Sequence, residues 1–102
     1  MSFGVGFGWG LDSAFYLAAV AYAPESGITM TVRTDSPGVQ FYTGNYLNGS
    51  LRGKDGANYP RYSGFCLETQ IFPDAINHPD FPSCIVEKGV PQMFFTEYGF
   101  SV

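Results

Sequence analysis

Two polar side chains in otherwise apolar, strand-like segments are the strongest candidates for chemistry. Glu68 is the only formal charge between Gly64 and Pro73, within Phe-Cys-Leu-Glu-Thr-Gln-Ile-Phe. We expect a carboxylate in such surroundings to be poorly solvated, which would make it a better proton acceptor near neutral pH. Glu68 is therefore a candidate general base. A strand whose Glu68 side faces water would explain the same pattern without any chemistry.

Gln40 has a similar setting, as a polar side chain within Val-Gln-Phe-Tyr. Its amide offers a hydrogen-bond donor and an acceptor together, as sugar hydroxyls require, although a surface position in a strand would explain it as well. Aromatic rings can stack on the face of a sugar, but with 18% aromatic residues most rings must belong to the core. The candidate stacking rings are those of Trp9, Phe41, Tyr42 and Tyr46.

The single histidine and the two cysteines match no metal-binding pattern. His78 follows Cys66 by 12 positions and precedes Cys84 by 6, which fits no zinc spacing, and no Cys-x-x-Cys pair occurs. The residue pattern therefore predicts no metal site. Because His78 lies in a loop beside Pro79, a structural or exposed role is favoured over a Cys-His nucleophile pair. Two free thiols in a reducing compartment are favoured over one disulfide bridge.

The composition indicates a single all-β domain covering residues 1–102. A chain of this length buries roughly two thirds of its unfolded surface, which is enough for one core. Aromatic residues make up 18% of the chain and charged residues 14%, with 13 glycines and 7 prolines scattered among them. Aromatic residues favour strands, whereas glycine and proline favour the turns between strands.

Charge and hydropathy exclude several classes of partner. The net charge is −4, and 5 Lys and Arg spread along the chain cannot form a phosphate-binding stripe, so nucleic acid is not expected. No apolar run reaches the ~18 residues of a membrane span. Residues 14–23 are mostly apolar, but no Lys or Arg precedes Arg33, which argues against a secretion signal. We expect a cytoplasmic protein that does not bind membranes.

The alternation of apolar and polar residues predicts the strands that must position these side chains. The segments are 28–33, 38–43 and 65–72, with further candidates at 84–86 and 93–100. Turn-forming clusters separate them. In the third segment, one face would carry Phe65, Leu67, Thr69 and Ile71, and the other Cys66, Glu68 and Gln70.

The N-terminal region leaves alternatives open. Apolar residues from Leu11 to Tyr22 recur at helical spacing behind Asp12 as a possible cap, so periodicity alone favours a helix. The same stretch could form a strand with alternate residues on one face. The glycines at positions 4, 6, 8 and 10 do not match the dinucleotide-binding fingerprint, so we expect a flexible or irregular N-terminus.

Two long blocks resemble a known family. Residues 37–53, Pro-Gly-Val-Gln-Phe-Tyr-Thr-Gly-Asn-Tyr-Leu-Asn-Gly-Ser-Leu-Arg-Gly, are similar to the C-terminal part of the aldose 1-epimerase (galactose mutarotase) family. So are residues 63–70, Ser-Gly-Phe-Cys-Leu-Glu-Thr-Gln, and the segments Phe-Pro-Asp at 72–74 and Asn-His-Pro-Asp-Phe-Pro at 77–82. The resemblance covers residues 24–102 and extends to Leu-Asp-Ser-Ala-Phe at 11–15.

The resemblance implies a fold and a reaction. The family fold is an antiparallel β-sandwich, of which this chain would form part. Its members interconvert the α and β anomers of hexoses such as galactose and glucose, without a metal or organic cofactor. By position, Glu68 matches the catalytic base, and Gln40 and Asp12 match residues that bind sugar hydroxyls. A shared sugar site predicts that Gln40 and Glu68 lie on neighbouring strands, with their side chains on the same face of one sheet. The resemblance also favours a strand over a helix from Phe15 to Tyr22.

Departures from the family pattern leave three functions open. The family's catalytic histidines lie in a part that is absent here, His78 matches a loop residue, and Ser13 replaces the histidine that usually follows the aspartate. The chain could supply the base half of an aldose 1-epimerase site. It could instead be a non-catalytic carbohydrate-binding module, or a structural β-domain. In the first two cases the partner is a hexose. Open sheet edges would call for self-association or for the missing N-terminal part of the domain.

Overall fold

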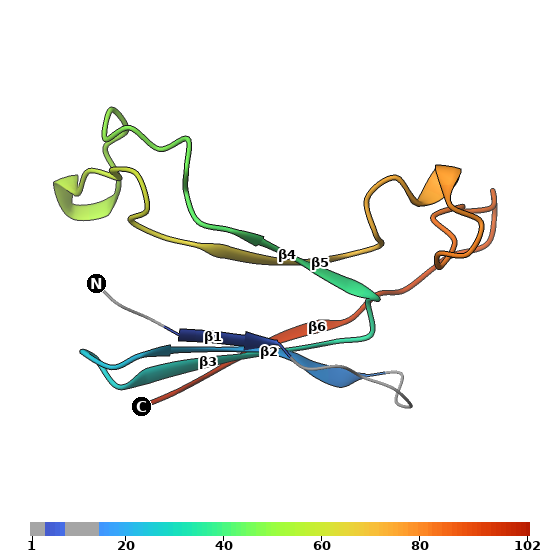
Figure 1. The fold of residues 1–102 in the computed structure, drawn as a ribbon, viewed down its shortest axis with the longest axis horizontal. Helices are drawn as coiled ribbons and strands as arrows, with labels where there is room; N and C mark the ends of the chain where they lie inside the picture. The colour runs from blue at the N-terminus through green and yellow to red at the C-terminus, as the bar shows by residue number, and fades with distance from the viewer. Residues whose placement is uncertain (1–3, 8–14) are drawn as a thin grey trace.

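The computed structural model describes residues 4–7 and 15–102 and contains two antiparallel sheets. Figure 1 shows them as two layers, with the larger sheet below the smaller one. The all-β, antiparallel fold is confirmed. The four-stranded sheet has the order β1 (Gly4–Phe7), β2 (Tyr16–Ala23), β3 (Ile28–Thr34) and β6 (Thr96–Ser101), and the two-stranded sheet pairs β4 (Gly38–Tyr42) with β5 (Cys66–Gln70). Two short 3-10 turns span Lys54–Gly56 and Ala75–Asn77.

The segment with competing helix and strand patterns is the strand β2. It pairs with β1 on one edge and with β3 on the other. A shift in register between Leu17 and Ala19 accompanies the burial of both Ala18 and Ala19. Pairing along both edges outweighs the helical spacing of the apolar residues, because tertiary context overrides a local preference. The strand predicted from Phe15 to Tyr22 is confirmed.

The expectation of an irregular N-terminus is wrong for Gly4–Phe7, which forms β1. Gly4 pairs with Tyr22 and Gly6 with Val20 across the antiparallel ladder. Glycine keeps both backbone hydrogen-bonding groups, so an adjacent strand edge can order it despite its flexibility. Trp9 and Asp12 lie outside the described residues.

The strand predicted at Cys84–Val86 is also wrong. These three residues adopt no strand, and Ile85 and Val86 are exposed at 54% and 65%. A segment this short forms a strand only where a neighbouring edge satisfies its backbone, and none pairs with it here.

The last predicted strand starts later than expected, at Thr96 instead of Met93. At Phe95, the residue before the strand, a hydrogen bond to a side chain replaces the regular backbone pairing with β3. The backbone N–H of Phe95 donates to Oδ1 of Asp35 at 2.9 Å, and the backbone N–H of Asp35 donates to the Phe95 carbonyl at 3.3 Å. Regular pairing with β3 begins only after this contact.

The core lies between the two layers. Leu67 of β5 forms a buried cluster with Ala19 of β2 and Val32 of β3. Partly buried apolar side chains pack around this cluster, namely Met30, Val39, Phe41 and Phe65. One face of the β4–β5 pair is therefore fixed against the larger sheet.

Hydroxyl groups link the layers beside this core. The hydroxyls of Thr69 and Thr96 are 2.6 Å apart, and that of Thr96 is 3.1 Å from the hydroxyl of the fully buried Thr34. Tyr98 of β6 donates from its hydroxyl to the Leu67 carbonyl at 2.8 Å. Thr69 and Leu67 both belong to β5, the strand that carries Glu68. Their contacts therefore hold β5 in a defined position over β3 and β6.

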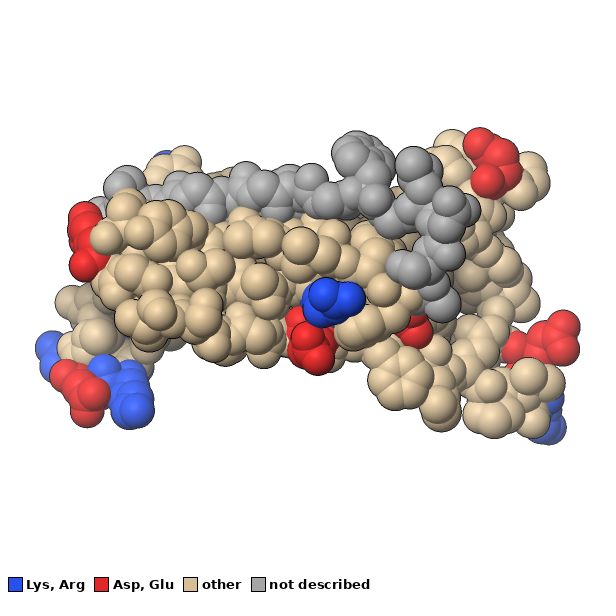
Figure 2. Space-filling view, turned by 90° about the horizontal axis from the view of Figure 1, so that it is seen from below, with Lys and Arg blue, Asp and Glu red and all other residues tan. Residues whose placement is uncertain are grey.

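Much apolar surface remains exposed among the described residues. The buried apolar side chains there number five, three of them alanines, while Phe100, Met93 and Tyr46 are exposed at 70%, 71% and 90%. Figure 2 views the molecule from the side of the larger sheet, where charged residues lie mostly at the margins of an uncharged surface. No helix in the described part of the chain is long and apolar enough to cross a membrane.

Candidate functional site

Gln40 and Glu68 are direct partners across the β4–β5 ladder. Opposed residues of an antiparallel pair project to the same face, with Cβ atoms about 4.5–5.5 Å apart. The two side chains therefore lie together although the long connection 43–65 separates their strands. The predicted placement of these residues on neighbouring strands and on one face of one sheet is confirmed.

The pair lies on the outer face of the smaller sheet. Successive residues of a strand alternate between faces, and Val39, Phe41 and Leu67 point into the core between the layers. Gln40 and Glu68 thus point away from the larger sheet, and both are exposed. The expected poor solvation of Glu68 is wrong for this chain, because no third layer among the described residues covers the outer face.

Two connections border this outer face. The segment 43–65 leaves one end of the β4–β5 pair and the segment 71–95 leaves the other. In Figure 1 both rise on the side away from the larger sheet. The Gln40–Glu68 pair is therefore the middle of a surface with loops at both ends, which is the kind of position in which loops carry binding residues.

The strand register shows which candidate aromatic residues lie on the same face as Gln40 and Glu68. Phe41 is on the inner face, where its ring meets that of Phe65 edge to face with centroids 6.1 Å apart. Tyr42 is on the outer face with Gln40, and its hydroxyl accepts a hydrogen bond from the backbone N–H of Tyr46 at 3.2 Å. Of the rings proposed to stack on a sugar, Tyr42 therefore shares the face of the pair.

Cys66 is a further member of the outer face. It pairs with Tyr42 across the ladder and is an exposed, free thiol. The alternation in 65–72 already placed it on the side of Glu68. Cys84 is also a free thiol.

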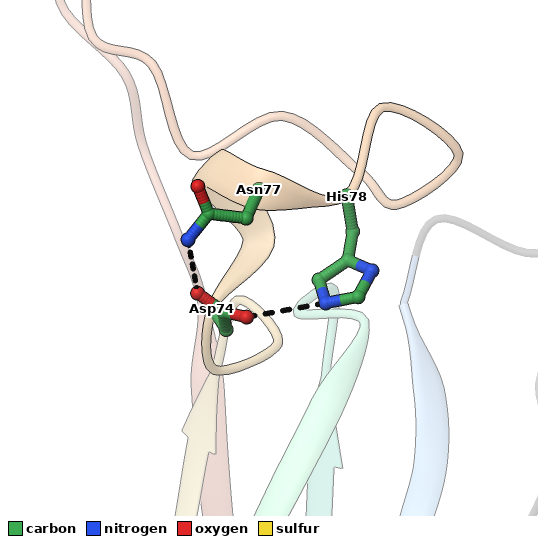
Figure 3. A network of polar contacts seen from close by, with 3 residues as sticks. All are labelled: Asp74, Asn77 and His78. Carbon is green, nitrogen blue, oxygen red and sulfur yellow. Dashed lines mark hydrogen bonds and ion pairs between the residues drawn. The ribbon is translucent and has the colours of Figure 1, made fainter.

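His78 belongs to a local network in the connection after β5, shown in Figure 3. Its Nε2 is 3.2 Å from Oδ2 of Asp74, and Nδ2 of Asn77 donates to Oδ1 of the same carboxylate at 2.5 Å. The imidazole also stacks on the ring of Phe81, with centroids 4.6 Å apart. These contacts give His78 a structural role in this loop.

Metal-ligating side chains do not gather in the described part of the chain. Within residues 4–7 and 15–102, no group of three or more His, Cys, Asp and Glu side chains could hold a metal ion. His78 and Cys84 line one shallow hollow in the 71–95 connection, whereas Cys66 lies on β5.

The strand pair and its flanking loops fall within a known sequence family. A sequence model described as aldose 1-epimerase matches residues 5–98. The chain belongs to the aldose 1-epimerase family. Both Gln40 and Glu68 lie inside the matched region, as do the 43–65 and 71–95 connections.

Individual members of the aldose 1-epimerase family agree with this assignment. Galactose mutarotase of Homo sapiens is 50% identical over 93 residues, which cover 91% of this chain and 27% of the human protein. Galactose mutarotase of Bos taurus is 54% identical over 77 residues, 76% of this chain and 22% of the bovine protein. Aldose 1-epimerase of Escherichia coli (strain K12) is 34% identical over 103 residues, covering 89% of this chain and 29% of that protein. The chain thus spans about a quarter of the length of these curated relatives.

Proposed function

We propose that this chain supplies the base half of an aldose 1-epimerase site that interconverts the α and β anomers of hexoses such as galactose and glucose. Glu68 is the base, and Gln40 and Asp12 bind sugar hydroxyls. The observation that carries the proposal is the direct pairing of Gln40 with Glu68 on an accessible face, inside the region that matches the family. The partner is a small sugar, and the reaction needs no metal or organic cofactor.

The proposed reaction consists of proton transfers around one ring-opening step. The Glu68 carboxylate removes the proton of the anomeric hydroxyl. The electrons of that O–H bond form the C1 carbonyl while the bond from C1 to the ring oxygen breaks and the ring oxygen takes a proton from a general acid. Rotation about the C1–C2 bond presents the other face of the aldehyde. The reverse steps close the ring, so atoms, electrons and protons balance.

The two side chains divide this work according to their chemistry. A carboxylate is an acceptor and can hold the anomeric proton during ring opening. The Gln40 amide can donate to one hydroxyl and accept from another, which fixes the position of the ring relative to the base. Their direct opposition across the ladder suits a base and a binding group that contact neighbouring hydroxyls of one sugar.

The general acid is proposed to come from outside these 102 residues. The only histidine is His78, which is engaged with Asp74 and stacked on Phe81 in a loop. A missing general acid lowers the rate by about 10²- to 10⁴-fold. The isolated chain is therefore a sugar-binding protein with little turnover, and full activity needs the acid to be supplied.

A second candidate function is sugar binding without catalysis. The exposure of Glu68 favours it, because a strand position that faces water explains this side chain without any chemistry. The two candidate functions differ in whether a complete site that includes this chain converts one sugar anomer into the other. We place either activity in the cytoplasm, where Cys66 and Cys84 would remain free thiols.

The proposal is tested by a chimera in which the 93 residues of this chain that match human galactose mutarotase replace the corresponding segment of that protein. Polarimetry on freshly dissolved α-D-galactose measures its rate against buffer and against the human enzyme. We expect catalysis within about 10-fold of the human enzyme, since general-acid loss alone would cost more. A folded chimera that binds galactose with no rate above buffer would contradict the epimerase role and leave the binding module.

A further inference from the structure

The ring of Phe72 lies against Gly38 on the outer face of the smaller sheet. A Cβ atom added at Gly38 would come within 2.9 Å of Cδ1 and of Cε1 of Phe72. Gly38 is two residues before Gln40 in β4, so its Cβ direction is that of Gln40. The Phe72 ring therefore occupies the next position along the face of the Gln40–Glu68 pair, about 7 Å along the strand.

The register agrees with this placement from the side of β5. Gly38 pairs with Gln70, two ladder positions from the pairing of Gln40 with Glu68 and on the same face. Phe72 follows Gln70 by two residues, so its side chain projects to the same face as that of Gln70. Its ring therefore lies over Gly38. Glycine is the only residue that leaves room for the ring there without a shift in its position.

Other side chains hold the ring in this position. The rings of Phe72 and Phe81 meet edge to face, with centroids 5.3 Å apart and an angle of 69°. Phe81 stacks in turn on His78, which is paired with Asp74 in the network of Figure 3. An aromatic side chain packed on one side loses little entropy when a ligand covers its free side, and Phe72 is still 36% exposed.

We propose that Phe72 is a sugar-binding residue that stacks against the C–H face of the hexopyranose ring. The inference rests on the proposed function and adds the ring contact to it. A pyranose has hydroxyls around its rim and apolar C–H groups on its faces. Polar groups such as Gln40 and Glu68 can bind the rim, and an aromatic ring at the edge of the same surface can cover one face. The site should therefore prefer a closed ring to an open-chain polyol.

The test is an NMR titration of the 102-residue chain with methyl β-D-galactopyranoside, a ring that cannot open, and with galactitol as the open-chain comparison. The glycoside should shift the Gln40 side-chain amide and the Phe72 ring protons together. Phe72→Leu removes the π surface and should weaken the affinity about 3- to 10-fold, whereas Phe72→Tyr should retain it. Galactitol should bind more weakly than the glycoside and should lose nothing in Phe72→Leu.

Two further variants separate stacking from general damage to the fold. Gly38→Ala keeps Phe72 but displaces its ring, and should weaken binding as Phe72→Leu does. Phe100→Leu is the matched control, because Phe100 is exposed on β6 of the other sheet, and its affinity should be unchanged. An unaltered amide spectrum of β3 and β6 shows that each variant is folded.

The possible failures are distinguishable. If the glycoside shifts Gln40 and Glu68 but affinity is the same in Phe72→Leu, Gly38→Ala and the parent chain, the stacking role is wrong and the sugar site stands. If the glycoside shifts none of Gln40, Glu68 and Phe72, both the sugar site and the stacking role are contradicted.

Discussion

Gln40 and Glu68 face each other across the β4–β5 ladder on the side turned away from the core. Their relative position is set by backbone pairing and by Leu67, Phe41 and Val39, which pack on the opposite face. Either side chain can therefore be replaced without disturbing the strands that carry it. This independence makes the proposed sugar site open to tests by substitution.

The first prediction concerns the proposed binding role of Gln40. Gln40→Leu keeps the size of the side chain but removes its hydrogen bonds to sugar hydroxyls. At roughly 0.5–1.5 kcal/mol for each net hydrogen bond, we expect KM of the chimera for α-D-galactose to rise about 3- to 10-fold, with kcat changed less. Initial-rate polarimetry over a range of sugar concentrations gives both constants.

The matched control for Gln40 is Gln92→Leu. Gln92 donates from its side chain to the Ile85 carbonyl at 3.1 Å in the 71–95 connection, so it also loses an amide hydrogen bond. We expect its KM to match that of the parent chimera. Equal KM values for Gln40→Leu and the parent would argue against any contact between Gln40 and the sugar.

The second prediction concerns the packing under the site. Leu67 is 4% exposed and joins the two layers, whereas Leu51 is 63% exposed in the 43–65 connection. Leu67→Ala should lower the free energy of unfolding by about 2–5 kcal/mol, and Leu51→Ala should change it by less than about 0.5 kcal/mol. Urea denaturation followed by circular dichroism measures both. Similar midpoints for the two variants would contradict the two-layer core.

The third prediction concerns the hydroxyl link between the layers. Thr96→Val preserves shape but removes the contacts with Thr69 and Thr34, so we expect a loss of about 1–2 kcal/mol in the free energy of unfolding. Thr43→Val removes one exposed hydrogen bond, to Asn45, and should cost clearly less. The same denaturation experiment applies, and a Thr96→Val midpoint at or above that of Thr43→Val would refute the link.

Sequence patterns predicted the placement of the Gln40–Glu68 pair because period-two alternation assigns faces. The two long blocks resembling aldose 1-epimerases then identified which strands belong to one site. The solvation of Glu68 could not be predicted in this way. A lone charge in an apolar strand has the same pattern whether a further layer covers its face or water does, and that depends on packing remote in sequence.

The remaining differences have the same origin. The pattern at 84–86 is apolar enough for a strand, but no edge is available to pair with it. The glycines of Gly4–Phe7 indicated flexibility, yet the exposed edge of β2 orders them. The position of Phe72 over Gly38 depends on how the chain turns after β5, which no local pattern specifies. Local propensity thus predicted the strands whose own sequence and neighbouring strand agree. It failed where the presence or absence of a neighbouring strand decides the structure.

The role of Glu68 as the base is tested most directly by Glu68→Gln in the chimera with human galactose mutarotase. Glutamine preserves the shape of the side chain and some hydrogen bonding but cannot accept the anomeric proton. Glu97→Gln is the matched control, because Glu97 is an exposed carboxylate on β6 in the other sheet, and His78→Ala controls for the one histidine. Circular dichroism checks that all three variants fold.

Polarimetry on α-D-galactose then gives the deciding rates. We predict that Glu68→Gln lowers the catalysed rate by at least about 10²-fold, while Glu97→Gln and His78→Ala change it little. A folded Glu68→Gln variant that keeps most of the parent rate would contradict the proposal and leave Glu68 as an ordinary residue on the surface of a strand.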